Sequence, residues 1–134
     1  MSDARPVSID RPEASPPTLD AAAIAQLQAL DPTGRGGLVR RVLLAFESSS
    51  ARLSAQLETA RAEGDRATMR LVAHTLKSSA AIVGATRLSQ LAAAAELALH
   101  HDCAEAELQA HLDAMQNGVS DALAGIASTL KNIA

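Results

Sequence analysis

The stretch from residue 74 to residue 85, HTLKSSAAIVGA, contains residue types that could support nucleophilic chemistry. Histidine is a covalent nucleophile, and the free side chain is largely neutral near pH 7 because its reference pKa is about 6.5. Lys77 follows His74 by one helical turn, so it would place a positive charge beside any negative charge that the histidine comes to carry. Residues 78–81 are all small, which would let the backbone of another protein approach.

The position of His74 on its helix decides whether it is available to a partner. We expect a helix over about 66–83, and at about 100° per residue its apolar side chains fall in one sector that must face the interior. The members of this sector are Met69, Val72, Leu76, Ala80 and Val83. His74 lies almost half a turn from the centre of this sector, so we expect it to face outward.

The side chains around His74 would form its exposed surroundings. Arg70, Lys77, Ser78 and Ala81 share its side, because residues three, four and seven apart stack on one helix face. Leu71 and Ile82 flank this face and would give it an apolar margin for docking. An ordinary surface histidine is the alternative interpretation of these observations.

The rest of the chain predicts a helical domain. Four of the five prolines lie in residues 1–17, where we expect a flexible tail, and residues 18–134 would form the domain. Alanine and leucine dominate, and Phe46 is the only aromatic residue. The predicted helices cover about 19–30, 38–62, 66–83, 86–101 and 103–131. This pattern predicts an all-α fold, an up-and-down antiparallel four-helix bundle with a short additional N-terminal helix.

Several residues are expected to set the boundaries of these helices. Gly64 and Asp65 read as a helix stop followed by an N-cap, and Asp102 reads as the cap of the last helix. Gly118 and Gly125 lie inside that last helix and would each weaken it by about 1 kcal/mol relative to alanine, so we expect its end to fray.

The apolar stripes of three predicted helices complete the expected core. In the first helix the apolar residues are Leu19, Ile24, Leu27 and Leu30. In the fourth they are Leu88, Leu91, Ala95 and Ala98. In the last they are Leu108, Leu112, Met115, Val119, Leu123, Ile126 and Leu130.

Composition and motifs argue against several classes of function. The net charge of −3 provides no broad positive field for nucleic acid. No secretory signal and no long apolar run appears, so we expect a soluble cytoplasmic protein without a membrane segment. The chain has no Gly-rich nucleotide loop of the P-loop type and no carboxylate set for Mg²⁺, so ATP-dependent kinase activity is not expected.

The remaining histidines and the cysteine suggest no metal site. His100, His101 and Cys103 are close in sequence, but adjacent helix residues point about 100° apart and structural zinc usually takes four ligands. We interpret these residues as a cluster at a helix end, where they interact favourably with the helix dipole. Cys103 is the only cysteine, which fits a reducing compartment, and His111 reads as a packing or surface residue.

AHTLKSSAAIVGA resembles the signature of histidine-containing phosphotransfer (HPt) domains, H-x-L-K-G-[SA]-[SA]-x-x-[IVL]-G-A. The matching positions are His74, Leu76, Lys77, Ser79, Val83, Gly84 and Ala85. The similarity extends over roughly residues 19 to 130, including the spacing of the neighbouring helices. Ser78 departs from the pattern, because family members usually have glycine there, and this change could alter which partner docks best.

The resemblance implies a phosphorelay carrier. His74 would accept a phosphoryl group from a phospho-aspartate of a receiver domain in a hybrid histidine kinase and pass it to the receiver of a response regulator. Lys77 would stabilise the phosphoryl charge, Ser78 or Ser79 would add a hydrogen bond, and Glu96 of the following helix would orient the other ring nitrogen. A solvated helix glutamate is the alternative for Glu96.

The same resemblance implies no cofactor on this chain, because the Mg²⁺ ion of such a relay belongs to the receiver. We expect a monomer, since the bundle can bury its own apolar stripes. Two other functions stay open as hypotheses. One is a non-catalytic helical module that binds and inhibits a receiver, and the retained His74 and Lys77 argue against it. The other is the phosphoacceptor domain of a chemotaxis-type kinase, which would need a catalytic domain that 134 residues do not accommodate.

Overall fold

The computed structural model describes residues 19–133, whose regular secondary structure is entirely helical. Its helices are α2 (Ala21–Ala29), α3 (Leu38–Glu63), α4 (Arg66–Val83), α5 (Thr86–His100) and α6 (Glu105–Asn132). Residues 19–133 contain no strand, so the prediction of an all-α fold is confirmed. The predicted tail, residues 1–17, lies outside the described residues.

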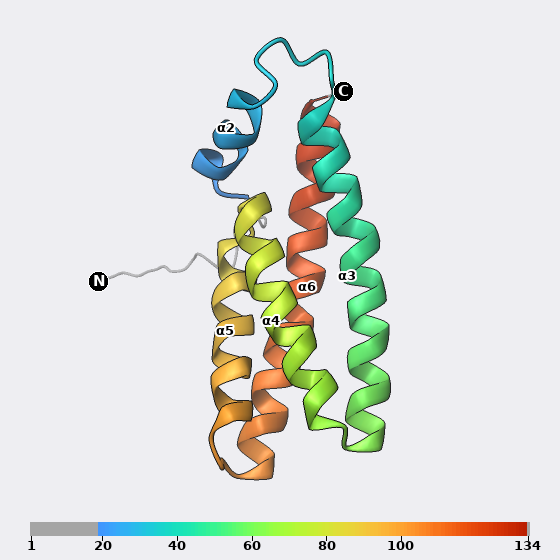
Figure 1. The fold of residues 1–134 in the computed structure, drawn as a ribbon, viewed down its shortest axis with the longest axis vertical. Coiled ribbons are helices and arrows are strands. Elements are labelled where there is room, and N and C mark those ends of the chain that lie inside the picture. The colour runs from blue at the N-terminus through green and yellow to red at the C-terminus, as the bar shows by residue number, and fades with distance from the viewer. Residues whose placement is uncertain (1–18, 134) are drawn as a thin grey trace, which may run out of the picture.

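The four long helices lie along the long axis of the molecule, and the short α2 lies at one end of them (Figure 1). Consecutive long helices pack against one another, and α6 returns to contact α3, so that the four helices enclose one core. The most extensive contact between helices is that of α4 with α5. α2 contacts both α3 and α4.

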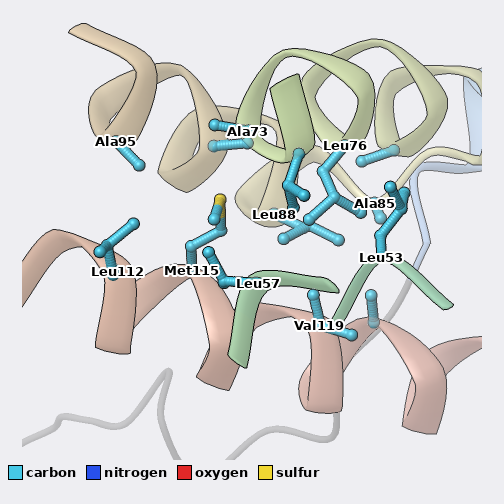
Figure 2. Close-up of a cluster of buried hydrophobic side chains, with 14 of the residues drawn as sticks. Leu53, Leu57, Ala73, Leu76, Ala85, Leu88, Ala95, Leu112, Met115 and Val119 are labelled. Carbon is cyan, nitrogen blue, oxygen red and sulfur yellow. The ribbon is translucent and has the colours of Figure 1, made fainter. Parts of the chain in front are cut away.

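The core consists almost entirely of leucine, alanine and other aliphatic side chains. Figure 2 shows Leu53 and Leu57 of α3, Leu76 of α4, Leu88 of α5, and Met115 of α6 gathered in it. Full burial of one such large side chain contributes about 1.5–3 kcal/mol relative to leaving it exposed. The stripe predicted for residues 66–83 is confirmed, because all of its members are buried: Met69, Val72, Leu76, Ala80 and Val83.

Six residues of the predicted stripes are not fully buried, and four of these pack against the core while partly exposed: Leu19, Ile24, Leu123 and Leu130. Leu30 is 75% exposed, because α2 ends at Ala29 and Leu30 already turns toward the loop that leads to α3. Leu91 is only partly buried, whereas Ala92 and Leu99 of the same helix are buried. The α5 stripe is therefore rotated slightly away from Leu91.

The predicted cap of the last helix is wrong. α6 begins at Glu105, and its N-cap is Ala104, which makes no side-chain capping hydrogen bond. Asp102 lies too early in the connection to reach the first free backbone N–H groups. Glu105 and Glu107 lie in the first turn instead, where negative charge interacts favourably with the helix dipole.

Gly118 of α6 has a packing role that the helix propensity scale does not describe. A Cβ on Gly118 would lie 2.8 Å from Cδ1 of Leu91 and 3.3 Å from Cδ1 of Leu88. Gly118 and Gly125 are both buried, and α6 continues past them to Asn132. Glycine at position 118 lets α5 and α6 approach closely.

Gly84 ends α4 and also contacts the backbone of Asp20, the N-cap residue of α2. Its φ of +80° is a left-handed conformation that glycine adopts without strain. The Asp20 N–H donates a 2.7 Å hydrogen bond to the Gly84 carbonyl. A Cβ at this position would lie 2.8 Å from the backbone N and 2.9 Å from the backbone O of Asp20.

We predict that Gly84→Ala destabilises the protein more than Gly64→Ala does. Gly64 also has a positive φ, +70°, but a Cβ there would meet no atom within 4 Å, so that variant reports backbone strain alone, about 1–2 kcal/mol. Gly84→Ala adds a clash with backbone, and overpacking costs about 1–3 kcal/mol more. Urea unfolding followed by circular dichroism measures both. Equal losses in the two variants would contradict the proposed contact with Asp20.

Candidate functional site

His74 is positioned by a helix whose two ends are well defined. The Asp65 carboxylate caps α4 by accepting a 3.1 Å hydrogen bond from the Thr68 N–H, and Gly84 ends the helix. The hydrogen bonds from Thr68 lower the pKa of Asp65, so the cap is ionised at neutral pH. The predicted helix stop at Gly64 and N-cap at Asp65 are therefore confirmed.

The predicted outward orientation of His74 is confirmed. Its side chain is 61% exposed, while Val72, Ala73 and Leu76, its neighbours on α4, are buried in the core. The apolar stripe of α4 fixes the rotation of the helix, and the imidazole is consequently held at the surface.

Glu96 of α5 connects the imidazole to the neighbouring ammonium group. Its Oε2 lies 2.9 Å from His74 Nδ1, and its Oε1 lies 2.7 Å from Lys77 Nζ. Each carboxylate oxygen thus has one partner on α4. The Glu96 side chain is only 16% exposed, so this bridge is partly shielded from water.

The charge state of Glu96 follows from these contacts. The hydrogen bond from Lys77 lowers its pKa most, and the hydrogen bond from His74 lowers it further, whereas partial burial raises it. The net shift is downward, so Glu96 is ionised at neutral pH. A carboxylate can only accept hydrogen bonds. The ring nitrogen that faces it, Nδ1, must therefore carry a hydrogen, and in the neutral ring the lone pair then lies on Nε2.

A second hydrogen bond joins α4 and α5 near the site. The Ser89 hydroxyl of α5 donates a 2.8 Å bond to the backbone carbonyl of Lys77. Sequence reasoning missed this residue, because a serine near the beginning of a helix usually reads as a surface or capping residue.

The two serines after Lys77 differ in their surroundings. Ser78 is exposed and shares the face of His74. Ser79 lies on another side of α4, partly buried, and its hydroxyl donates a 2.9 Å hydrogen bond to the Thr75 carbonyl within the same helix. Of the two serines proposed from the sequence, Ser78 is therefore the one near the imidazole.

The other residues singled out in the sequence fall into two groups. Arg70 is partly buried and Ala81 is exposed, both on the side of His74, and Leu71 and Ile82 are exposed on α4 as expected. Gly84 is buried against Asp20, so it supports the fold and contributes no docking surface.

Leu97 enlarges the apolar surface near the site. It is 59% exposed and follows Glu96 directly in α5. Sequence reasoning missed Leu97, because its exposure depends on how α5 rotates against α4 and α6.

The histidines and the cysteine near the end of α5 form no candidate metal site. His100 and His101 are exposed, and the partly buried Cys103 thiol lies 3.5 Å from the Ala98 carbonyl. Within residues 19–133, no group of three or more histidine, cysteine or acidic side chains is arranged to hold a metal ion.

A comparison with known families agrees with this geometry. The family model of the Hpt domain matches residues 41–131, more than half of the 134-residue chain. The chain belongs to the Hpt domain family. An Hpt domain takes part in phosphotransfer within a phosphorelay and interacts with receiver domains. His74, Lys77, Ser89 and Glu96 all lie within the matched residues.

No curated protein and no solved structure matches this Hpt domain. None of the helices in residues 19–133 is long and apolar enough to cross a membrane.

We predict that Glu96→Gln reduces the dependence of stability on acid pH. Because the pKa of Glu96 is lowered below its ordinary value of 4.5 on folding, its contribution to stability is complete above that value and is lost as the pH falls through the lowered pKa. The difference in free energy of unfolding between wild type and Glu96→Gln should therefore shrink as the solution is acidified. Asp65 also contributes to acid unfolding, but it is common to both proteins.

Urea unfolding at a series of pH values, followed by circular dichroism, measures this difference. Glu58→Gln is the matched control, since Glu58 is exposed on α3. Parallel stability curves for wild type and Glu96→Gln would contradict the role assigned to the carboxylate.

Proposed function

We propose that this Hpt domain is a phosphohistidine carrier, which accepts a phosphoryl group on Nε2 of His74 from a receiver aspartate and passes it to a second receiver. The observation that carries the proposal is the state of the imidazole. Nδ1 faces the Glu96 carboxylate, and the side chain is 61% exposed, so Nε2 is the nucleophilic nitrogen available to a partner. Histidine can form covalent intermediates of this kind.

The phosphoryl transfer to His74 requires no removal of a proton from the ring. The Nε2 lone pair attacks the phosphorus of the aspartyl phosphate, an N–P bond forms, the P–O bond breaks, and the aspartate leaves as a carboxylate. Phosphorylation at Nε2 leaves the ring positively charged with the hydrogen still on Nδ1. The Glu96 carboxylate, 2.9 Å away, offsets this charge. The reverse sequence passes the phosphoryl group to the second receiver.

Lys77 would stabilise the negative charge of the phosphoryl oxygens. Phosphoryl transfer depends mainly on positioning and on charge stabilisation, with little covalent work by the protein. Two unit charges about 4 Å apart interact by about 1 kcal/mol in water and by about 4 kcal/mol near a protein surface. Lys77 lies close enough to the ring to supply such an interaction, since both share Glu96 as a partner. The exposed Ser78 hydroxyl would add a hydrogen bond.

The surroundings of His74 suit a receiver as the docking partner. Small and apolar exposed side chains on α4 and α5 would give it contact area: Leu71, Ala81, Ile82 and Leu97. In this proposal the carrier is a monomeric, cytoplasmic, up-and-down antiparallel four-helix bundle with one short extra helix. It needs no cofactor of its own and has no ATP-dependent kinase activity, and Mg²⁺ enters with the receivers of a hybrid kinase and a response regulator.

We predict that only variants with His74 intact become phosphorylated. Incubation with a receiver phosphorylated on its aspartate should label wild type with acid-labile, alkali-stable phosphate. His74→Gln should take up no label, because amide nitrogen is not nucleophilic. His111→Gln, which removes a partly buried histidine on α6, is the control and should be labelled normally.

Absence of label on wild type would reject the carrier function. If wild type took up no label but still bound the receiver tightly, and His74→Gln bound it equally well, the protein would instead be a non-catalytic module that occupies a receiver.

We predict that phosphorylation of the wild type occurs on Nε2 alone. Correlation of ³¹P with ¹⁵N in the phosphorylated, nitrogen-labelled protein identifies the nitrogen that carries phosphorus. In Glu96→Gln the constraint on Nδ1 is weaker, so treatment with phosphoramidate should give a mixture of the two isomers. Free histidine treated in the same way provides both reference signals. Phosphorus on Nδ1 of wild-type His74 would show that Glu96 does not orient the ring.

A further inference from the structure

The helices α4 and α5 both bury alanine side chains in the core. Ala73 and Ala80 of α4 and Ala92 and Ala95 of α5 are completely buried. Small side chains allow helices to pack closely, as these two helices do. They interdigitate little, however, and interdigitation of large side chains is what normally fixes the position of one helix along another. An alanine-rich contact needs another device to define that position.

The Ser89 hydroxyl is suited to this purpose. It donates a 2.8 Å hydrogen bond to the backbone carbonyl of Lys77 and thereby crosses from α5 to α4. The bond is partly buried, so water competes with it less than at the surface. Two other serine hydroxyls in the molecule, those of Ser50 and Ser79, bond to carbonyl groups of their own helices. Neither of those bonds can relate one helix to another.

Ser89 and Glu96 are seven residues apart on α5, so they lie on the same side of the helix, two turns from each other. Ser89 holds the backbone of Lys77, and Glu96 holds the side chains of Lys77 and His74. A shift of α5 by a single residue would move Glu96 by about 1.5 Å along the axis and rotate it by about 100°. Such a shift would break contacts of 2.7 and 2.9 Å.

We propose that Ser89 is a positioning residue for phosphotransfer, which fixes α5 along α4 so that the Glu96 carboxylate reaches both His74 and Lys77. Ser89 touches neither the imidazole nor the ammonium group, and it acts through Glu96. The effect of Ser89 on phosphotransfer rests on the function proposed above. Its effect on the position of the Glu96 carboxylate does not depend on that function.

The test compares Ser89→Ala, Ser89→Thr and Ser50→Ala with the wild type. Carbon-13 NMR of the glutamate carboxyl groups follows the titration of Glu96, and uptake of label from a phosphorylated receiver gives the rate at His74. In Ser89→Ala we expect the pKa of Glu96 to rise toward its ordinary value of 4.5, since Lys77 and His74 are then held less firmly against it. The rate should fall by about 2- to 10-fold, the range that corresponds to one hydrogen bond.

The other two variants separate positioning from stability. Ser89→Thr retains a hydroxyl and should restore both the pKa of Glu96 and the rate. Ser50→Ala removes a buried 2.7 Å hydroxyl–carbonyl hydrogen bond within α3, and it should change stability without changing the titration of Glu96. Unaltered titration of Glu96 in Ser89→Ala, or the same alteration in Ser50→Ala, would overturn the inference. A wild type that takes up no label would reject the proposed function instead, and the Glu96 titration would still decide the role of Ser89.

Discussion

The site depends on one carboxylate that two groups share. Glu96 accepts from His74 through one oxygen and contacts Lys77 through the other, so a single side chain of α5 orients both groups of α4. Its ionised state is maintained by the same contacts, because they lower its pKa despite partial burial. Without it, the imidazole would be an exposed ring free to rotate. With it, Nδ1 is bound to Glu96 and Nε2 is left free for a partner.

Close approach between helices makes that shared carboxylate possible, and small residues make the close approach possible. Buried alanines lie in α4 and α5, and Gly118 admits the Leu91 side chain between α5 and α6. At the end of α4, Gly84 serves in the same way, because only a residue without Cβ leaves room for the backbone of Asp20. Aliphatic side chains around Phe46 fill the remaining core. The bundle therefore combines a core of large aliphatic side chains with a few positions where small residues allow close approach.

Local rules predicted what depends on local sequence. The stripe around Leu76 follows from helix periodicity, and it correctly turned His74 outward. Gly64 and Asp65 identified a helix boundary because their conformational preferences act within a few residues. The predictions that failed concern features that depend on residues farther away in the chain. Asp102 satisfied a capping preference, but the true start of α6 depends on where α5 stops.

Contacts between helices were harder to anticipate than the helices themselves. The sequence suggested Glu96 as a partner of His74 only through family resemblance, and a solvated glutamate fitted its pattern equally well. Ser89 gave no signal, since no periodicity encodes which carbonyl a hydroxyl on another helix will meet. Leu97 was missed because its exposure depends on how α5 is rotated against its neighbours.

The ion pair of Glu96 with Lys77 also determines how the face around His74 looks to a docked partner. With a neutral ring, the charges of Glu96 and Lys77 cancel each other. The phosphoryl oxygens add about −1.5 to −2 at neutral pH. The phosphorylated ring adds about +1, so the loaded surface is more negative by about 0.5 to 1 charge. Screening at physiological ionic strength limits this difference to a range of about 8 Å. The two states are therefore nearly identical at a distance and become distinguishable only on contact.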